Sequence, residues 1–184
     1  MQHRIFLVAT RADVLWDEAR RHWQERHGEI FVSTPGLRRY VQNRPLTEPG
    51  QGRGVVCSET SFDSRQAERA AYSSRYYQDV VAADEARFLD REGVWNARVV
   101  SGAAAGEPAG AYRVLWFDEK PPEGERWSPL QLSRPVPGPG RGSRLYSTWT
   151  DDRDLAIEIA EGSGGLALAC EPVPFPITCA TEDA

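Results

Sequence analysis

Apolar positions along the first hundred residues follow two different periods, and the change of period predicts where strands and helices lie. Short runs of apolar and β-branched residues predict strands over residues 5–9, 37–43, 55–62 and 94–100. Apolar side chains three and four positions apart predict helices over residues 13–33, 64–72 and 76–89. The predicted order is β-α-β-β-α-β, a split βαβ arrangement in which helices cover one face of a four-stranded sheet. The other face has to be buried against something else.

The first predicted helix has the clearest amphipathic pattern. Asp13 is the expected N-cap, and Thr34-Pro-Gly36 ends the helix and turns the chain. Its core-facing stripe is expected to consist of Leu15, Ala19, Trp23 and His27. Ser64 is the expected N-cap of the next helix.

The second part of the chain reads as an incomplete copy of the first. Residues 102–110 form a linker of small residues, and further strands are predicted over residues 112–117, 130–136, 144–149 and 166–171, with a helix over 151–161. We therefore expect an α+β fold with a ferredoxin-like unit over residues 1–101 and a degenerate second half, lacking its first helix, over residues 111–178. The two sheets would form an α/β barrel within one chain, or pair between two chains in a homodimer.

Charge and cysteine content exclude several classes of protein. The net charge is −5, with 22 basic and 27 acidic residues, which argues against a nucleic-acid partner. No apolar run approaches the roughly 20 residues that a membrane-spanning helix needs, and the apolar stretch at the N-terminus is too short for a signal peptide. Cys57, Cys170 and Cys179 have no CxxC spacing, so we expect neither a disulfide framework nor a zinc site, and a cytoplasmic location.

Motifs for nucleotide and metal chemistry are also missing. The sequence has no GxGxxG, GxxxxGK[ST] or GxSxG motif, so no nucleotide cofactor is expected. His22 and His27 flank Glu25 in a near-match to HExxH, but five positions on an α-helix place two side chains roughly 140° apart. A metal site is therefore not predicted there.

Three residues are the candidate catalytic groups. His27 lies on the core-facing stripe, where an imidazole could act as general acid or base, or could simply bind a carbonyl at the helix end. Tyr40 could donate a hydrogen bond to an enolate or phenolate oxygen. Glu59 could act as a base if desolvation raises its pKa, or could pair with an arginine such as Arg38 or Arg39.

A second set of residues is expected to contact the substrate. Aromatic side chains could stack on a flat substrate, Asn43 could orient it or order the following loop, and Cys57 should be a small buried residue. Tyr40 and Asn43 are three apart on one strand, so at most one of them should face a given cavity. The candidate substrate-binding residues are Trp23, Asn43, Cys57, Trp95 and Trp116. Asp84 and Phe88 are expected to be structural.

Four segments in order carry a family resemblance. They are Trp23-Gln-Glu-Arg-His-Gly28, Pro35-Gly-Leu-Arg-Arg-Tyr-Val-Gln-Asn43, Cys57-Ser-Glu-Thr-Ser-Phe-Asp63 and Ala83-Asp-Glu-Ala-Arg-Phe-Leu-Asp90. Over roughly residues 3–100 the chain resembles the EthD family. The resemblance implies an α/β barrel with a largely apolar cavity and a pathway enzyme that needs no metal or organic cofactor.

The leading hypothesis is a cofactor-independent enzyme that acts on an aromatic, polyketide-type intermediate of natural-product biosynthesis. Proton transfer would drive a cyclisation, isomerisation, dehydration or decarboxylation. The alternatives are a cofactor-free monooxygenase acting on a phenol, a non-catalytic protein that binds a hydrophobic metabolite, and a haem-binding barrel.

Overall fold

Eight antiparallel strands form the centre of the molecule. A computed structural model describes residues 1–47, 54–102, 110–117, 127–134, 144–162 and 167–177. The strands are β1 (Gln2–Thr10), β2 (Leu37–Pro45), β3 (Val55–Phe62), β4 (Leu89–Gly102), β5 (Tyr112–Trp116), β6 (Ser128–Leu132), β7 (Arg144–Thr150) and β8 (Ala167–Phe175). They close a barrel in the order β1-β3-β2-β8-β5-β7-β6-β4. The barrel therefore closes within a single chain, which decides between the two arrangements that the sequence left open.

The two parts of the chain contribute strands in equivalent order. The first four strands are adjacent as β4-β1-β3-β2, and the last four as β8-β5-β7-β6. The two sets meet where β2 pairs with β8 and where β4 pairs with β6. The predicted boundary between residues 101 and 111 stays a prediction, since both parts build one barrel.

The barrel interior holds the largest apolar cluster. Because strand side chains alternate between faces, every second residue points inward. Seven of the strands, or residues beside them, contribute to this cluster, which includes Ile5, Cys57, Trp95, Leu115 and Leu145. The remaining strand, β2, contributes the buried polar residue Asn43.

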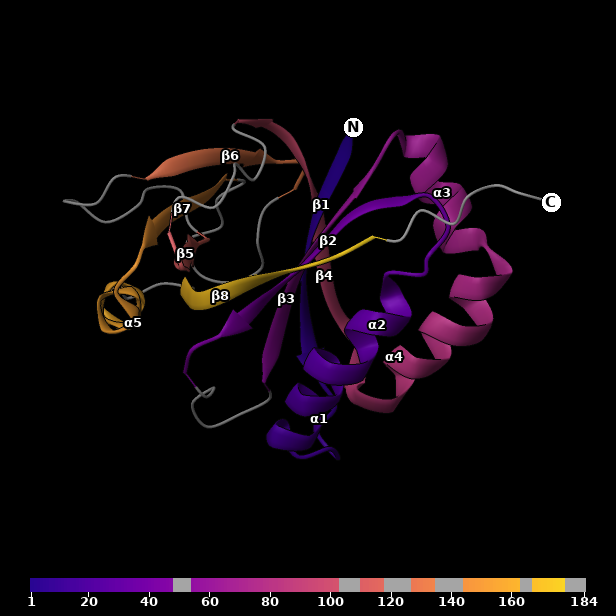
Figure 1. Ribbon diagram of the computed structural model, residues 1–184, viewed down its shortest axis with the longest axis horizontal. Helices are drawn as coiled ribbons and strands as arrows, with labels where there is room; N and C mark the ends of the chain where they lie inside the picture. The colour runs from indigo at the N-terminus through magenta and orange to yellow at the C-terminus, as the bar shows by residue number, and fades with distance from the viewer. Residues whose placement is uncertain (48–53, 103–109, 118–126, 135–143, 163–166, 178–184) are drawn as a thin grey trace.

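The helices lie outside the barrel and are unevenly distributed (Figure 1). Those of the first part cover its sheet: α1 (Trp16–His22), η1 (Trp23–His27), α2 (Gly28–Phe31), α3 (Arg65–Ser73), η2 (Tyr77–Val81) and α4 (Ala82–Phe88). The second part has α5 (Arg153–Glu161), which packs on β5 and β8 through Val114, Ala156 and Ala169. Two further apolar clusters fill the space between the first sheet and its helices.

The start of the first helix was predicted wrongly. The helix begins at Trp16, and Leu15 occupies the N-cap position with no side-chain cap. Asp13 instead accepts hydrogen bonds from Arg11 at 2.9 and 2.6 Å. Leu15 is 77% exposed because it lies before the first helical turn. The rest of the expected stripe, Ala19, Trp23 and His27, is buried as predicted.

Other boundaries differ by a few residues. Strand β4 begins at Leu89, five residues earlier than predicted, and β6 ends at Leu132. Residues 135–136 of that predicted strand, and the start of the last strand at residue 166, lie outside the described residues. The cap at Ser64 is confirmed, since its hydroxyl accepts a hydrogen bond from the Ala67 amide at 3.1 Å. Gly36 has φ +74°, a left-handed conformation suited to glycine, in the predicted turn.

Candidate active site between the helices and the sheet

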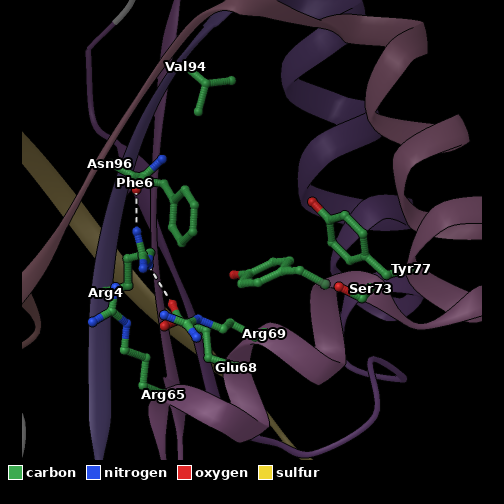
Figure 2. A pocket seen from close by; sticks show the side chains of 10 residues that line it. Arg4, Phe6, Arg65, Glu68, Arg69, Ser73, Tyr77, Val94 and Asn96 are labelled. Carbon is green, nitrogen blue, oxygen red and sulfur yellow. Dashed lines mark hydrogen bonds and ion pairs between the residues drawn. The ribbon is translucent and has the colours of Figure 1, made fainter.

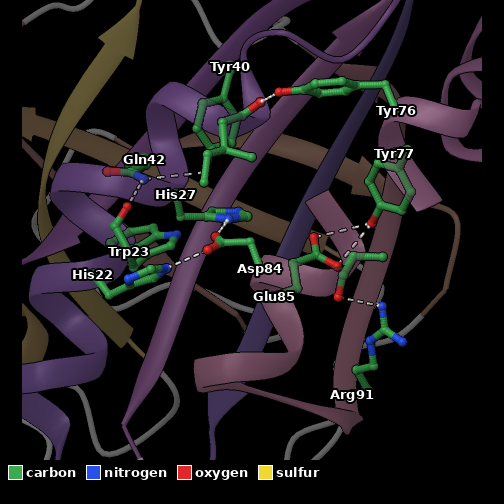
Figure 3. Close-up of polar contacts among 12 residues, drawn as sticks. His22, Trp23, His27, Tyr40, Gln42, Tyr76, Tyr77, Asp84, Glu85 and Arg91 are labelled. Atoms are coloured by element: carbon green, nitrogen blue, oxygen red, sulfur yellow. Dashed lines mark hydrogen bonds and ion pairs between the residues drawn. The ribbon is translucent and has the colours of Figure 1, made fainter. Parts of the chain in front are cut away.

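His27 and Asp84 form a buried pair between the helices and the first sheet. Nδ1 of His27 lies 3.0 Å from Oδ2 of Asp84, and both side chains are about 95% buried. Figure 3 shows the carboxylate of Asp84 between the rings of His22 and His27. His22 approaches the other oxygen, with its Nε2 2.7 Å from Oδ1. One carboxylate from α4 therefore orients two histidines from the first helical segment.

A π-helical turn makes this arrangement possible. Residues Trp23–His27 form η1, in which the hydrogen bonds run from i to i+5. The wider turn brings positions 22 and 27 toward one face, whereas an α-helix would hold them roughly 140° apart. The assumption that the two histidines point in different directions was wrong for this reason. Single π-turns of this kind are frequent at functional sites.

The two adjacent acids of α4 have opposite pKa shifts. Burial by itself would raise the pKa of the Asp84 carboxyl, but hydrogen bonds from His27 and His22 outweigh it and hold that pKa below its ordinary value. Burial raises the pKa of Glu85, whose two oxygens accept the Tyr77 hydroxyl at 3.2 Å each. When two neighbouring carboxyl groups have pKa values shifted in opposite directions, one commonly acts as the charged group and the other as the proton carrier.

The ionised state of Asp84 fixes the proton on His27. A carboxylate is an acceptor only, so Nδ1 of His27 carries the proton that lies between them. Nε2 of His27 has no hydrogen bond within the described part of the chain. This nitrogen is therefore available to a ligand group in the adjoining cavity. The ring is held by Phe31 and Phe88, at centroid distances of 5.6 and 5.3 Å.

A small, mostly apolar cavity adjoins His27. Its walls include Phe6, Trp23, Phe31 and Tyr77, with Glu85 as an acidic member. The space is about 40 Å³, enough for a group the size of a hydroxyl or water but too small for an aromatic ring. A larger ligand can therefore place only a reacting group here unless side chains move.

A larger cleft lies next to this cavity. Both spaces are lined by Phe6, Tyr72 and Tyr77, so they meet at these three rings. The outer cleft measures about 560 Å³. Figure 2 shows Phe6 and Val94 on the strand side and Tyr77 on the helix side. A ligand that spans both spaces would place its inner end beside His27.

Two of the predicted site residues lie on the helix side of the sheet together with His27. Trp23 lines the small cavity. Tyr40 is buried against Phe31, with stacked rings 4.6 Å apart, and is not among the residues that line the cavity. Gln42 links the two by donating hydrogen bonds to the Trp23 carbonyl at 2.6 Å and to the Tyr40 hydroxyl at 3.4 Å. Burial raises the pKa of that hydroxyl above its ordinary value.

The other predicted residues do not reach this cavity. Asn43, Cys57 and Trp95 point into the barrel, and Trp116 lies on its outer side beside Trp127, with ring centroids 6.4 Å apart. The expectation that Tyr40 and Asn43 face opposite ways is met.

Glu59 belongs to a separate polar cluster inside the barrel. It accepts hydrogen bonds from Arg113 at 2.6 Å and Asn43 at 2.9 Å, and its other oxygen lies 2.8 Å from Nε2 of His3. Arg113 in turn lies 5.2 Å from the Trp149 ring centre. Because the sheet separates this cluster from His27, the three predicted catalytic residues do not form one site.

Of the two alternatives for Glu59, a pKa raised by desolvation or an ion pair with an arginine, the structure shows the second. Burial favours such a rise, but Arg113, His3 and Asn43 outweigh it and hold the pKa of this carboxyl well below its usual range. The partner is Arg113 of the second half rather than Arg38 or Arg39. A carboxylate that remains ionised and has three polar partners is better suited to stabilising the barrel than to accepting a proton.

Close packing from the second half supports the His27 segment. A Cβ added to Gly28 would lie 2.2 Å from Cζ of Phe175 in β8. The aromatic ring thus rests directly on the helix backbone next to His27. This contact gives a physical reason for glycine after the histidine.

The fold is an α/β barrel with a helix-covered cavity, and comparison with known proteins places its first part in a family. Residues 11–92 match the EthD domain, which confirms the resemblance over this part of the chain. Among the curated proteins, none matches the chain in sequence.

Three solved structures are similar to the chain. An EthD family protein from Bacillus halodurans is 14% identical, covering 52% of this chain and 96% of its own, with a TM-score of 0.39. A proposed monooxygenase from Fusobacterium nucleatum is 8% identical, covering 95% and 92%, with a TM-score of 0.50. A proposed chlorite dismutase is 10% identical, covering 94% and 96%, with a TM-score of 0.49. At these identities the similarity concerns the fold alone.

Two features of the described residues concern metal ions and membranes. They contain no group of three or more His, Cys, Asp or Glu side chains arranged to hold a metal ion. No helix among them is long and apolar enough to cross a membrane.

Proposed function

We propose that this protein is an acid–base enzyme that needs no cofactor and acts on an aromatic, polyketide-type substrate bound between the helices and the first sheet. The observation that carries the proposal is the hydrogen bond between His27 and the buried Asp84 at the inner end of an aromatic-walled cleft. A histidine oriented by a carboxylate in this way is a common general base.

Each polar group at the inner end has a defined part in the proposed reaction. Nε2 of His27 removes a proton from a carbon next to a carbonyl, or from a phenol. Asp84 is a positioning residue that stabilises the resulting imidazolium. Burial raises the pKa of Glu85, so this carboxyl is the candidate proton donor to the developing oxyanion, while the Tyr77 hydroxyl donates to Glu85. Trp23 and the other rings hold the substrate in one conformation, which lowers the entropic part of the barrier.

The roles first expected for other residues change accordingly. Tyr40 supports the site by packing on Phe31 rather than by touching the substrate. Glu59, Asn43, Cys57 and Trp95 stabilise the barrel interior. These assignments make cyclisation, isomerisation, dehydration or decarboxylation the open choices, because all four can begin with the same proton transfer.

Deuterium uptake from solvent tests the first chemical step. 6-Hydroxy-1-tetralone and larger hydroxylated ketones would be incubated anaerobically with EDTA in D₂O, and exchange next to the carbonyl followed by NMR. We expect exchange above the buffer rate for the wild type and none for His27→Gln. His3→Gln is the matched control, because His3 lies on the other face of the sheet. Equal exchange in wild type and His27→Gln would refute the proposal.

A cofactor-free monooxygenase is the second candidate. The Fusobacterium protein of similar fold is described as a proposed monooxygenase. The same histidine would deprotonate a phenol, and the phenolate would then react with oxygen. One oxygen atom would enter the product, and the other would leave as water with two electrons and two protons taken from the substrate itself. Products that gain an oxygen atom in air, and no product under nitrogen, would favour this candidate.

A binding protein without activity is the third candidate. Tight binding of the same compounds with no product in either atmosphere would support it.

Three expectations about the whole molecule accompany the proposal. We interpret each half as a ferredoxin-like unit because the two have the same strand order. We keep the homodimer as a proposal that native mass spectrometry can test. The cytoplasmic location rests on the thiols: Cys57 and Cys170 are buried and unpaired with each other.

A further inference from the structure

The outer cleft differs from the inner cavity in its charge. Its lining includes three arginines, Arg4, Arg65 and Arg69, against one acid, Glu68. The chain as a whole has a net charge of −5. The positive charge at the mouth of the cleft is therefore a local feature and does not follow from composition.

Helix stability does not explain the two arginines of α3. Arg65 is the first residue of this helix, where the helix dipole disfavours a positive charge. Arg69 follows at i+4, where two like charges repel each other. Within the described part of the chain neither forms an ion pair, and both are exposed at the cleft.

Arg4 presents a fixed donor to the same space. Its Nε donates to Oε1 of Glu68 and its Nη1 to Oδ1 of Asn96. Figure 2 shows the guanidinium held between these two residues. Its Nη2 has no hydrogen bond to any described residue. Since Glu68 is already neutralised by this pair, Arg65 and Arg69 keep their charge for a ligand.

We infer that the outer cleft binds a carboxylate group of the substrate, with the aromatic part of the substrate between Phe6, Tyr72 and Tyr77 and its reacting oxygen or carbon at His27. This inference rests on the proposed function for the inner end of the site. It defines the substrate class as a flat aromatic acid whose carboxylate and reacting group lie at opposite ends. Arginine suits this role because its planar fork matches the two oxygens of a carboxylate.

Paired ligands that differ only in charge test the inference. 6-Hydroxy-2-naphthoic acid carries a hydroxyl and a carboxylate at opposite ends, and its methyl ester is the neutral match. Binding of both would be measured by calorimetry at low and high salt, for the wild type, Arg65→Gln/Arg69→Gln and the control Arg87→Gln. Arg87 is an exposed arginine of α4 that lines neither space.

We expect the wild type to prefer the acid, and the double variant to bind it about tenfold more weakly, because each exposed arginine contributes only a few-fold. Ester binding should change less than about twofold, and added salt should weaken only the acid. Equal binding of acid and ester by the wild type would overturn the inference. The inference would also be overturned if the double variant lost affinity for the acid and the ester equally, or if Arg87→Gln lost as much affinity for the acid as the double variant. Tighter binding of 2-naphthyl phosphate than of the acid would overturn it as well.

The inference and the proposed function can fail separately. If Arg65→Gln/Arg69→Gln loses the acid preference while no ketone exchanges deuterium, the carboxylate site stands and the acid–base function does not. If exchange depends on His27 but the acid is not preferred, the function stands and the carboxylate site is wrong.

Discussion

Removing the positive charge from the barrel interior should destabilise the protein strongly. Arg113 and Glu59 are each 2% exposed and lie 2.6 Å apart. Replacing Arg113 with Met leaves Glu59 buried with His3 and Asn43 as its remaining partners among the described residues. Breaking a buried ion pair in this way costs about 3–5 kcal/mol. We therefore expect Arg113→Met to lower the free energy of unfolding by about 3–5 kcal/mol near neutral pH.

The pH dependence of this loss identifies its cause. In the wild type the folded-state pKa of Glu59 lies below its ordinary value of 4.5, so its contribution is present above that pH and is lost as the pH falls. Arg113 is the strongest influence that lowers the pKa of Glu59, so we expect burial to raise this pKa above the unfolded value in the variant. Its contribution is then present at low pH and is lost as the pH rises. The difference between the two proteins should shrink between about pH 7 and about pH 5.

Urea unfolding followed by tryptophan fluorescence at both pH values measures the effect. The control Arg87→Met should stay within about 0.5 kcal/mol of the wild type, since it alters an exposed arginine. Replacing Glu59 with Gln in the Arg113→Met background should restore part of the stability by removing the unpaired charge. A constant difference across the pH range would refute the account of this cluster.

Three further predictions concern the helix side of the sheet. Asp84→Asn should lower kcat by about 10²–10⁴-fold without a matching change in KM, because His27 loses its orientation. A shift in the pH profile of kcat distinguishes this effect from loss of folding. Gly28→Ala should cost about 1–3 kcal/mol in urea unfolding because its Cβ meets Phe175, and Phe175→Leu in the same chain should recover part of it. Glu85→Gln should stabilise the protein relative to the wild type as the pH rises, since burial raises the pKa of this carboxyl in the folded state; thermal unfolding across the pH range checks the sign.

Periodicity was enough to predict most elements of the fold. Strand and helix periods differ clearly in residues 5–100, and the buried stripe of Ala19, Trp23 and His27 followed from spacing alone. Closure of the barrel could not be predicted in the same way. It depends on pairing between β2 and β8 and between β4 and β6, which are far apart in sequence and carry no local signal.

The candidate site was predicted only in part. His27 and Trp23 could be found because they lie on the stripe, whereas Asp84 was expected to be structural and Glu85 was missed. Their roles depend on a π-turn and on contact between helices about 57 positions apart, as the His27–Asp84 bond shows. The arginine that pairs with Glu59 could not be identified because Arg113 is 54 positions away in the sequence.

One signal for that partner was present in the sequence. Arg113 is the only charged residue in the apolar run from Tyr112 to Phe117. A lone charge in a buried strand requires a buried partner of opposite charge. Searching the other predicted strands for an inward-facing acid would have led to Glu59.

In the proposed site, Asp84 holds the proton on Nδ1 of His27, so that Nε2 meets a ligand in the cleft. Long-range ¹H–¹⁵N NMR of the histidine side chains, with and without 6-hydroxy-2-naphthoic acid, tests it most directly. We expect His27 to be protonated at Nδ1 throughout and its Nε2 resonance to shift when the ligand binds. A His27 protonated at Nε2, or one whose Nε2 does not respond to bound ligand, would contradict it.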